Sequence, residues 1–352
     1  MFIIGLGTAT PPRRYTQSEC WNALLASPRY SELTPRSREI VEKVLTGDNG
    51  IRARFLSVDN LQDAFEQTPD ALHARFARYA PCVATEAAER ALRDAATLPR
   101  EIDAIVVSTC TGYLCPGLTS YVSERLGLRP DALAIDMVGQ GCGAALPNMR
   151  VAEALLASGR GRRVLSVCVE ICSAAFYMDN DPGVLISACL FGDGSGAAVL
   201  SAKPISGRRQ IEWKNAGTLL SARDRDFLRF ETRGGMLRNL LAPQVPVLAA
   251  RHAESVLHQV LERAGVSQDR IAAWVMHSGG REIILAIQRK FGLADHDVRW
   301  SRSVLSDYGN LSSSSVYFVL EATLNDHAPG GLWWMSSFGA GFSCHGALLE
   351  VE

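Results

Sequence analysis

The chain has 352 residues, 47% of them hydrophobic and 21% charged, which is the balance of a globular protein large enough for two subdomains. With 36 basic and 37 acidic residues its formal charge is −1, so its charge predicts neither nucleic-acid binding nor attraction to an anionic membrane. No apolar run has the length of a transmembrane helix, and the N-terminal segment MFIIGLGTATPPRR lacks the features of a secretory signal.

The nine cysteines are an odd number, and none of them forms a CxxC pair or a set with zinc-finger spacing. Unpaired thiols are typical of a reducing compartment. We therefore expect a cytoplasmic protein without membrane insertion and without a metal site.

The N-terminal region predicts a strand followed by helices. The segment FIIGLGTA at residues 2–9 is typical of a strand. Residues 84–97, ATEAAERALRDAAT, place apolar positions on one helical stripe among charged ones. A longer pattern then begins, and it occurs twice.

The first copy of this pattern covers residues 102–158. A buried-strand run, IDAIVVS, is followed by the turn CTGYLCPG and the helical segment LTSYVSERLGL. A second strand, ALAIDMV, leads through the turn around Cys142 to the helical segment MRVAEALLAS.

The second copy covers residues 271–324 and repeats the order of the first. The predicted strand IAAWVMH, a Gly-Gly turn and the helix EIILAIQRKFGL precede the predicted strand DVRWSRSVL, a Gly-Asn turn and the helix SSSVYFVLEATL. The matching order indicates an internally duplicated α/β protein. We place its two halves at residues 1–205 and 206–352.

Three chemically useful side chains follow predicted strands at equivalent points of the two halves: Cys142, His277 and Asn310. Functional groups collect beyond the carboxyl ends of strands in open α/β sheets. A pseudo-twofold axis between the halves would bring the thiol, the imidazole and the carboxamide into one site.

Cys142 lies between Gly141 and Gly143 at the predicted start of a helix. The N–H groups and dipole of a helix N-terminus favour a thiolate, and a nearby imidazolium would favour it further. The glycines would permit a sharp turn and close approach of a substrate. A buried structural cysteine is the alternative, since free cysteines are among the most buried residues. The equivalent positions of His277 and Asn310 favour a nucleophile.

His277 and Asn310 also have structural interpretations. His277 could be a core histidine, although Gly279 and Gly280 after it indicate close approach by a ligand. Asn310 could be a turn residue or a helix N-cap. Together the two side chains could supply neutral donors to one oxygen, forming an oxyanion hole.

Two reaction classes use such a set of groups. A cysteine hydrolase passes an acyl group from cysteine to water, with asparagine orienting the histidine. A condensing enzyme instead stabilises the enolate that a malonyl thioester forms on losing carbon dioxide, and this enolate attacks the acyl-cysteine. The sequence reveals no carboxylate base beside the three residues, and the duplication is foreign to papain-like hydrolases, so we favour condensation. A non-catalytic scaffold is a further alternative.

Five segments, in order along the chain, carry a recognisable family pattern. They are GQGCGAALPNMR, LFGDG, HSGG, SDYGNLSSSSV and SSFGAGFSCHGALLEV. These segments resemble motifs of the type III polyketide synthases, the chalcone synthase-like enzymes, with Ser278 and Ala340 where the family usually has proline. The resemblance spans essentially the whole chain. It implies a duplicated, thiolase-like αβαβα layered fold and a homodimer.

The resemblance also implies a reaction. Cys142 would accept the acyl group, and His277 and Asn310 would serve decarboxylation and bind the oxyanion. The substrates would be malonyl-CoA and an acyl-CoA starter, condensed repeatedly and cyclised to a pyrone or resorcinol-type product without a cofactor. The related enzyme that initiates fatty acid synthesis on acyl carrier protein uses the same three residues, but it usually carries HQAN where this chain has HSGG.

Pocket residues follow from the resemblance by position. Phe191 matches the gatekeeper phenylalanine between the CoA tunnel and the cavity, and Asn239 lies near the second gatekeeper. Cys115 falls in the dimer-interface loop, where its bond to Pro116 could be cis. The positions that line the elongation cavity are Cys110, Cys172, Ala175, Ser187 and Ser312. The small Ala175 and Ser187 favour a long aliphatic starter.

CoA-binding residues follow in the same way. Arg36 and Lys43 match basic positions of the family's CoA-binding helix, and Arg38 is adjacent to the third. Gly279 and Glu282 match the tunnel region. A solvated amphipathic helix face is an equally weighted interpretation of the basic residues.

Overall fold

The chain forms a layered α/β fold around a nine-stranded mixed sheet in the order β11-β12-β13-β8-β1-β7-β6-β4-β5. This computed structural model describes residues 1–159 and 161–352. The strands of the large sheet are β1 (Phe2–Ala9), β4 (Ala104–Ser108), β5 (Leu133–Met137), β6 (Arg163–Glu170), β7 (Gly194–Ser201), β8 (Ile211–Leu220), β11 (Ile271–Met276), β12 (Gly331–Gly339) and β13 (Ser343–Val351).

The sheet consists of two similar halves, joined where Phe2 of β1 pairs with Glu212 of β8. In the N-terminal half β4 runs parallel to β5 and β6, and β7 and β1 follow antiparallel. In the C-terminal half β11 runs parallel to β12, and β13 and β8 follow antiparallel. The shared order confirms the expected duplicated α/β fold. The boundary at residue 205 lies between β7 and β8 and stays a prediction.

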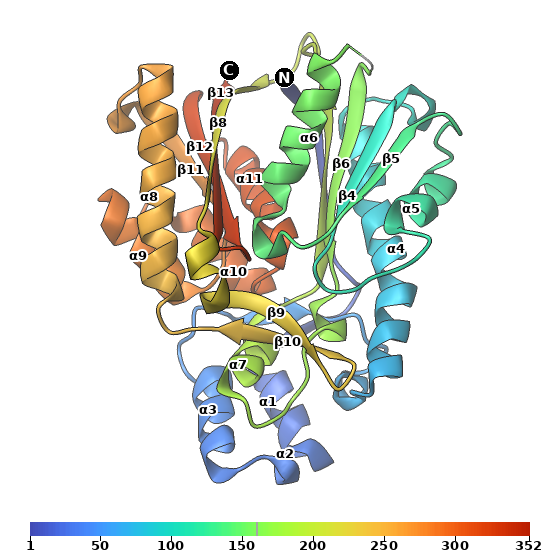
Figure 1. Cartoon of the computed structure of the whole chain (residues 1–352), viewed down its shortest axis with the longest axis vertical. Helices are drawn as coiled ribbons and strands as arrows, with labels where there is room; N and C mark the ends of the chain where they lie inside the picture. The colour runs from blue at the N-terminus through green and yellow to red at the C-terminus, as the bar shows by residue number, and fades with distance from the viewer. Residues whose placement is uncertain (160) are drawn as a thin grey trace.

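Helices cover and separate the two half-sheets, which gives five layers (Figure 1). Two helices lie between the half-sheets, two cover the outer face of the N-terminal half, and two cover the outer face of the C-terminal half. In this order they are α6 (Ala145–Ala157), α11 (Ser315–Asn325), α4 (Pro69–Asp94), α5 (Leu118–Leu126), α8 (Val245–Ala264) and α9 (Arg281–Phe291). No described helix is both long and apolar enough to cross a membrane.

The central layer explains the composition of its helices. Residues 316–320 of α11, VYFVL, are all buried, because sheets contact this helix on both sides. The polar Asn148 of α6 is also buried, and its Nδ2 donates to the carbonyl oxygens of Val106 and Val167, both at 3.1 Å. These bonds satisfy the carboxamide and hold α6 against the N-terminal half-sheet.

One predicted strand is wrong. The segment DVRWSRSVL belongs to α10 (Arg299–Tyr308) and the turn before it. Its buried residues Trp300, Ser301, Val304 and Leu305 recur at helical spacing, so the helix buries one face. Asn310 therefore follows a helix rather than a strand, and the C-terminal half has no described counterpart of β5.

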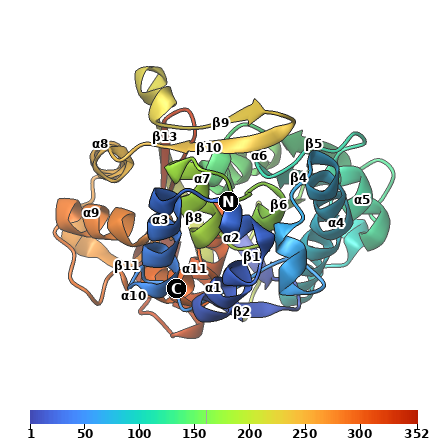
Figure 2. The same cartoon turned by 90° about the horizontal axis from the view of Figure 1, so that it is seen from below.

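Smaller elements gather at one end of the layers, as Figure 1 shows at the bottom and Figure 2 shows from below. They include helix α7 and the hairpin of β9 and β10. Residues of this hairpin and residues that follow β4 line a common cavity. The elements are α1 (Gln17–Leu25), α2 (Pro28–Glu32), α3 (Pro35–Thr46), α7 (Pro182–Leu190), β2 (Arg14–Thr16), β3 (Ala53–Phe55), β9 (Leu228–Arg233) and β10 (Met236–Leu241).

Candidate active site

Cys142, His277 and Asn310 line one small cavity of about 40 Å³, the candidate catalytic cavity. They come from three segments: the turn before α6, the end of β11, and the turn after α10. Phe191 and Asn239 line the same cavity. The structure thus brings together the three residues that the sequence pattern placed in one site.

Cys142 lies in a single helical turn, Gly141–Gly143, and α6 begins at Ala145. Gly141 has a φ of 55°, which favours glycine, and a Cβ on Gly143 would lie 3.1 Å from the backbone nitrogen of Gly339. The two glycines therefore allow this turn and its close contact with β12, and they place the sulfur at the cavity.

Burial opposes the thiolate that the helix N-terminus favours. It raises the pKa of the Cys142 thiol to about 12; a hydrogen bond from Ser312 opposes this shift and the charge of Glu170 adds to it. Burial also lowers the pKa of the His277 imidazole to about 3. Loss of hydration thus favours the neutral form of both groups.

The contacts of His277 favour one tautomer. Nδ1 bonds with Ser315 Oγ, and that hydroxyl lies 3.0 Å from the carbonyl oxygen of Ser312. With the hydroxyl donating to this carbonyl, Nδ1–H donates to the hydroxyl and the lone pair is on Nε2. Nε2 is buried without a hydrogen-bond partner. In this tautomer the imidazole offers the cavity an acceptor.

Asn310 is held so that its amide nitrogen can serve a substrate. Its Oδ1 accepts from the N–H of Ser312 at 2.9 Å, and its Nδ2 donates to the carbonyl oxygen of Gly279 at 3.0 Å. The backbone of Asn310 is also bonded to Leu190 and Gly192. One hydrogen of Nδ2 has no other partner among these contacts and can donate to an oxygen in the cavity.

Glu170 is a buried carboxylate that the sequence reasoning missed, and it is linked to Cys142 through Ser312 rather than directly. It is fully buried at the end of β6 and accepts from Ser312 Oγ at 3.3 Å, while that hydroxyl also contacts Cys142 Sγ at 3.3 Å. Burial raises the pKa of this carboxyl. The sequence contains one indication of this residue: a charged side chain ends the apolar run VLSVCVE.

Predicted pocket residues surround this network to different extents. Cys110 Sγ lies 3.3 Å from Ser312 Oγ, and Cys172 packs with Phe191 beside Cys142. Ser187 is buried behind Asn239, whose amide donates to it at 2.8 Å. Ala175 lines neither the cavity that contains Cys142 nor the one that contains Cys110; it is buried at the end of a short turn after β6.

The predicted CoA-binding residues are dispersed. Arg36 and Lys43 are exposed on α3, whereas Arg38 donates to the carbonyl oxygens of Tyr30 and Ser31 in α2. Gly279 lines the catalytic cavity. Glu282 is exposed in the first turn of α9, away from that cavity's lining.

Cys115 is exposed, and its bond to Pro116 is cis, as the sequence suggested. No disulfide forms among the nine cysteines, all of which are free in the described chain. Within the described residues no group of three His, Cys, Asp or Glu side chains could hold a metal ion.

The fold closely matches solved polyketide synthases. PKS-I of the brown alga Ectocarpus siliculosus superposes with a TM-score of 0.91 and 25% identity, over 99% of this chain and 97% of that chain. The 1,3,6,8-tetrahydroxynaphthalene synthase of Streptomyces coelicolor, a bacterial type III polyketide synthase, superposes with a TM-score of 0.88 and 24% identity, over 99% of both chains.

Curated relatives extend the match to sequence. The 3,5-dihydroxyphenylacetyl-CoA synthases of Amycolatopsis orientalis and Amycolatopsis balhimycina are 30% and 31% identical, each over 98% of this chain and 92% of the relative. Models of the N-terminal and C-terminal domains of chalcone and stilbene synthases match residues 1–204 and 229–349. The chain therefore belongs to the chalcone and stilbene synthase family and is a type III polyketide synthase, an acyltransferase that forms carbon–carbon bonds.

Proposed function

We propose that this enzyme loads an acyl group from an acyl-CoA starter onto Cys142 and extends it repeatedly with malonyl-CoA. Cyclisation then gives a pyrone or resorcinol-type product, and no cofactor takes part. The observation that carries the proposal is the shared cavity, where the Cys142 thiol, the unpaired Nε2 of His277 and a free N–H of Asn310 converge. The 3,5-dihydroxyphenyl ring in the relatives' name is a resorcinol ring, which supports that mode of closure.

Loading begins from the neutral pair. As Cys142 Sγ attacks the thioester carbonyl, its proton passes to His277 Nε2, and the carbon–sulfur bond to CoA breaks. CoA leaves as its thiolate, whose negative charge balances the positive charge of the imidazolium. While the proton is on His277, Nε2–H is a donor facing the cavity.

Extension uses this new donor. Malonyl-CoA loses carbon dioxide, and the electron pair of the broken bond forms an enolate whose oxygen accepts from His277 Nε2–H and Asn310 Nδ2–H. The enolate carbon then attacks the acyl carbonyl on Cys142. The new carbon–carbon bond replaces the thioester bond, and the released thiolate can take back the proton of His277.

Space for the growing chain lies next to the catalytic cavity. A larger cavity of about 630 Å³ is lined mainly by apolar atoms, including those of Phe76 and Leu237, and also contains Cys110. It shares Gly141 and Phe230 with the catalytic cavity. The volume of this cavity therefore supports a long aliphatic starter, whereas Ala175 does not line the cavity and gives no such support.

A homodimer would cover the opening of the larger cavity. Tyr113 and Val138 at its rim are 68% and 59% exposed, and Leu133 on the edge strand β5 is 49% exposed. Exposed apolar residues beside an unpaired strand edge favour association with another copy. We include a cytoplasmic homodimer in the proposal, with the free thiols favouring a reducing compartment.

The proposal is tested by separating decarboxylation from loading. His277→Ala and Asn310→Ala should each lower the release of carbon dioxide from malonyl-CoA by roughly 10²–10³-fold, because each removes an enolate donor. In Asn310→Ala, acylation of the enzyme by octanoyl-CoA should fall less than the release of carbon dioxide does. Equal decarboxylation by the wild type and Asn310→Ala would contradict the assigned roles.

A further inference from the structure

The cavity around Cys142 contains a polar side chain, Asn239, with an unused hydrogen-bond acceptor. Asn239 is 2% exposed on β10 and lines the catalytic cavity together with Cys142 and His277. Its Oδ1 is shielded from solvent and has no hydrogen-bond partner. A buried carbonyl oxygen without a donor is costly, so its retention at this site calls for a ligand that supplies one.

The orientation of this carboxamide is set by Ser187. Asn239 Nδ2 donates to Ser187 Oγ at 2.8 Å, and Ser187 Oγ donates its hydrogen to the carbonyl oxygen of Gly183 at 2.7 Å. While that hydrogen is used in this way, Ser187 Oγ accepts from Asn239. A flipped carboxamide would draw the hydrogen away from Gly183, so the observed orientation keeps both hydrogen bonds and turns Oδ1 away from Ser187.

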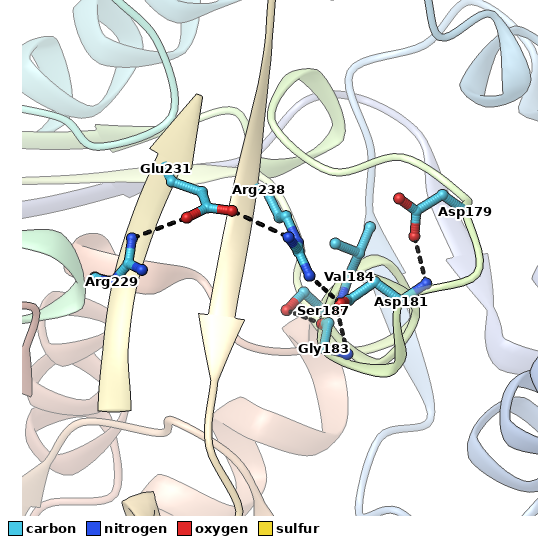
Figure 3. Close-up of polar contacts among 8 residues, drawn as sticks. All are labelled: Asp179, Asp181, Gly183, Val184, Ser187, Arg229, Glu231 and Arg238. Carbon is cyan, nitrogen blue, oxygen red and sulfur yellow. Dashed lines mark hydrogen bonds and ion pairs between the residues drawn. The ribbon is translucent and has the colours of Figure 1, made fainter. Parts of the chain in front are cut away.

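Neighbouring ion pairs hold the hairpin against α7. Figure 3 shows Arg238 between Asp181 and Glu231, with Arg238 Nη1 3.0 Å from the Glu231 carboxylate. Asp181 also accepts from the N–H groups of Gly183 and Val184 at the start of α7. The two elements that carry Asn239 and Ser187 are thus fixed to each other beside the cavity.

We propose that Asn239 is a specificity-determining residue whose Oδ1 accepts a hydrogen bond from an N–H or O–H group of the thioester substrate. Two parts of a substrate can supply this donor: an amide N–H of the pantetheine arm, or a hydroxyl of the acyl group. The inference rests on the proposed function. Each donor would replace a water molecule, which a cavity of about 40 Å³ can hold.

Two matched substrate pairs distinguish the two sources. The first pair is malonyl-pantetheine and its analogue with an ester oxygen in place of the amide N–H nearest the sulfur, read by carbon dioxide release. The second pair is 3-hydroxyoctanoyl-CoA and octanoyl-CoA, read by acylation of Cys142 in the mass spectrum. We expect the wild type to prefer the donor-bearing member of one pair by about 10-fold in kcat/KM.

Variants of Asn239 and Ser187 test whether these two residues cause the preference. Asn239→Leu keeps the side-chain size and should abolish the preference, and Ser187→Ala should reduce it by letting the carboxamide rotate. Arg78→Met is the control: it breaks an exposed ion pair with Asp59 and should leave the preference unchanged.

Equal rates within both pairs in the wild type, or ratios unchanged in Asn239→Leu and Ser187→Ala, would overturn the inference while leaving the proposed function intact. If the wild type releases no carbon dioxide and forms no acyl-Cys142 with any of the four thioesters, the proposed function fails and this inference fails with it.

Discussion

At the scale of single residues, burial favours a neutral thiol and a neutral imidazole over a preformed ion pair. The contact of Ser315 with Nδ1 leaves Nε2 without a partner at the cavity. We therefore expect the thiol of Cys142 to become nucleophilic as its proton leaves for His277, which links its reactivity to a bound electrophile.

Two substitutions should change the reactivity of Cys142 in opposite directions. Glu170→Gln removes the negative charge that raises the pKa of the thiol, so alkylation by iodoacetamide should be faster than in the wild type. Ser312→Ala removes the hydrogen bond that lowers this pKa, so alkylation should be slower.

Peptide mass spectrometry of Cys142 over a series of pH values measures both rates. The wild-type rate should still be rising at about pH 10, since burial raises the pKa of the thiol to about 12 and the thiolate fraction increases as the pH approaches that value. A wild-type plateau near neutral pH would show a resting thiolate and contradict the neutral pair.

At the scale of elements, the periodicity of the sequence predicted the helices and strands of the two repeated units with one exception, but not their contacts. Residues 297–305 were predicted as a strand, yet α10 buries Trp300, Val304 and Leu305 on a helical face. The positions of Cys142 and His277 in the fold could be predicted because the segments beside them have clear strand or helix patterns.

The hairpin over the cavity could not be placed in this way. Its position depends on side-chain pairs between β10 and α7 that lie far apart in sequence, such as Arg238 with Asp181 and Asn239 with Ser187. No local pattern reveals which residues of a hairpin will face a cavity. For the same reason the link from Glu170 through Ser312 to Cys142 became visible only in the fold.

The Arg238 ion pairs should control the mobility of this hairpin. Arg238→Met leaves Asp181 and Glu231 without their shared partner, so hydrogen exchange should accelerate across residues 228–241 and the melting temperature should fall by a few degrees. Arg78→Met, which breaks an exposed pair with Asp59, is the control and should change neither. Unchanged exchange in Arg238→Met would show that apolar packing alone holds the hairpin.

At the scale of the whole molecule, duplication creates the site, since each half contributes groups that the other lacks. The N-terminal half supplies Cys142 and Glu170, and the C-terminal half supplies His277 and Asn310. Helices α6 and α11 pack between the half-sheets, and the apolar core they form fixes the halves relative to each other. A single half would therefore hold a thiol without its base.

The proposed dimer belongs to this scale. Leu133→Glu and Val138→Glu place charges on the exposed apolar edge, so the double variant should sediment as a monomer while the wild type sediments as a dimer. Because each side chain is exposed in the single chain, the variant should keep its circular dichroism spectrum. A monomeric wild type would contradict the dimer, as would a double variant that remains dimeric.

The central claim is that Cys142 holds the acyl chain while malonyl-CoA extends it. The most direct test mixes the wild type with octanoyl-CoA and carbon-13-labelled malonyl-CoA, quenches in acid, and follows the Cys142 peptide by mass spectrometry. We predict an octanoyl adduct, then heavier adducts that contain labelled carbon, and no adduct in Cys142→Ala. An acyl adduct on a different residue would contradict the claim, as would labelled polyketide products from Cys142→Ala.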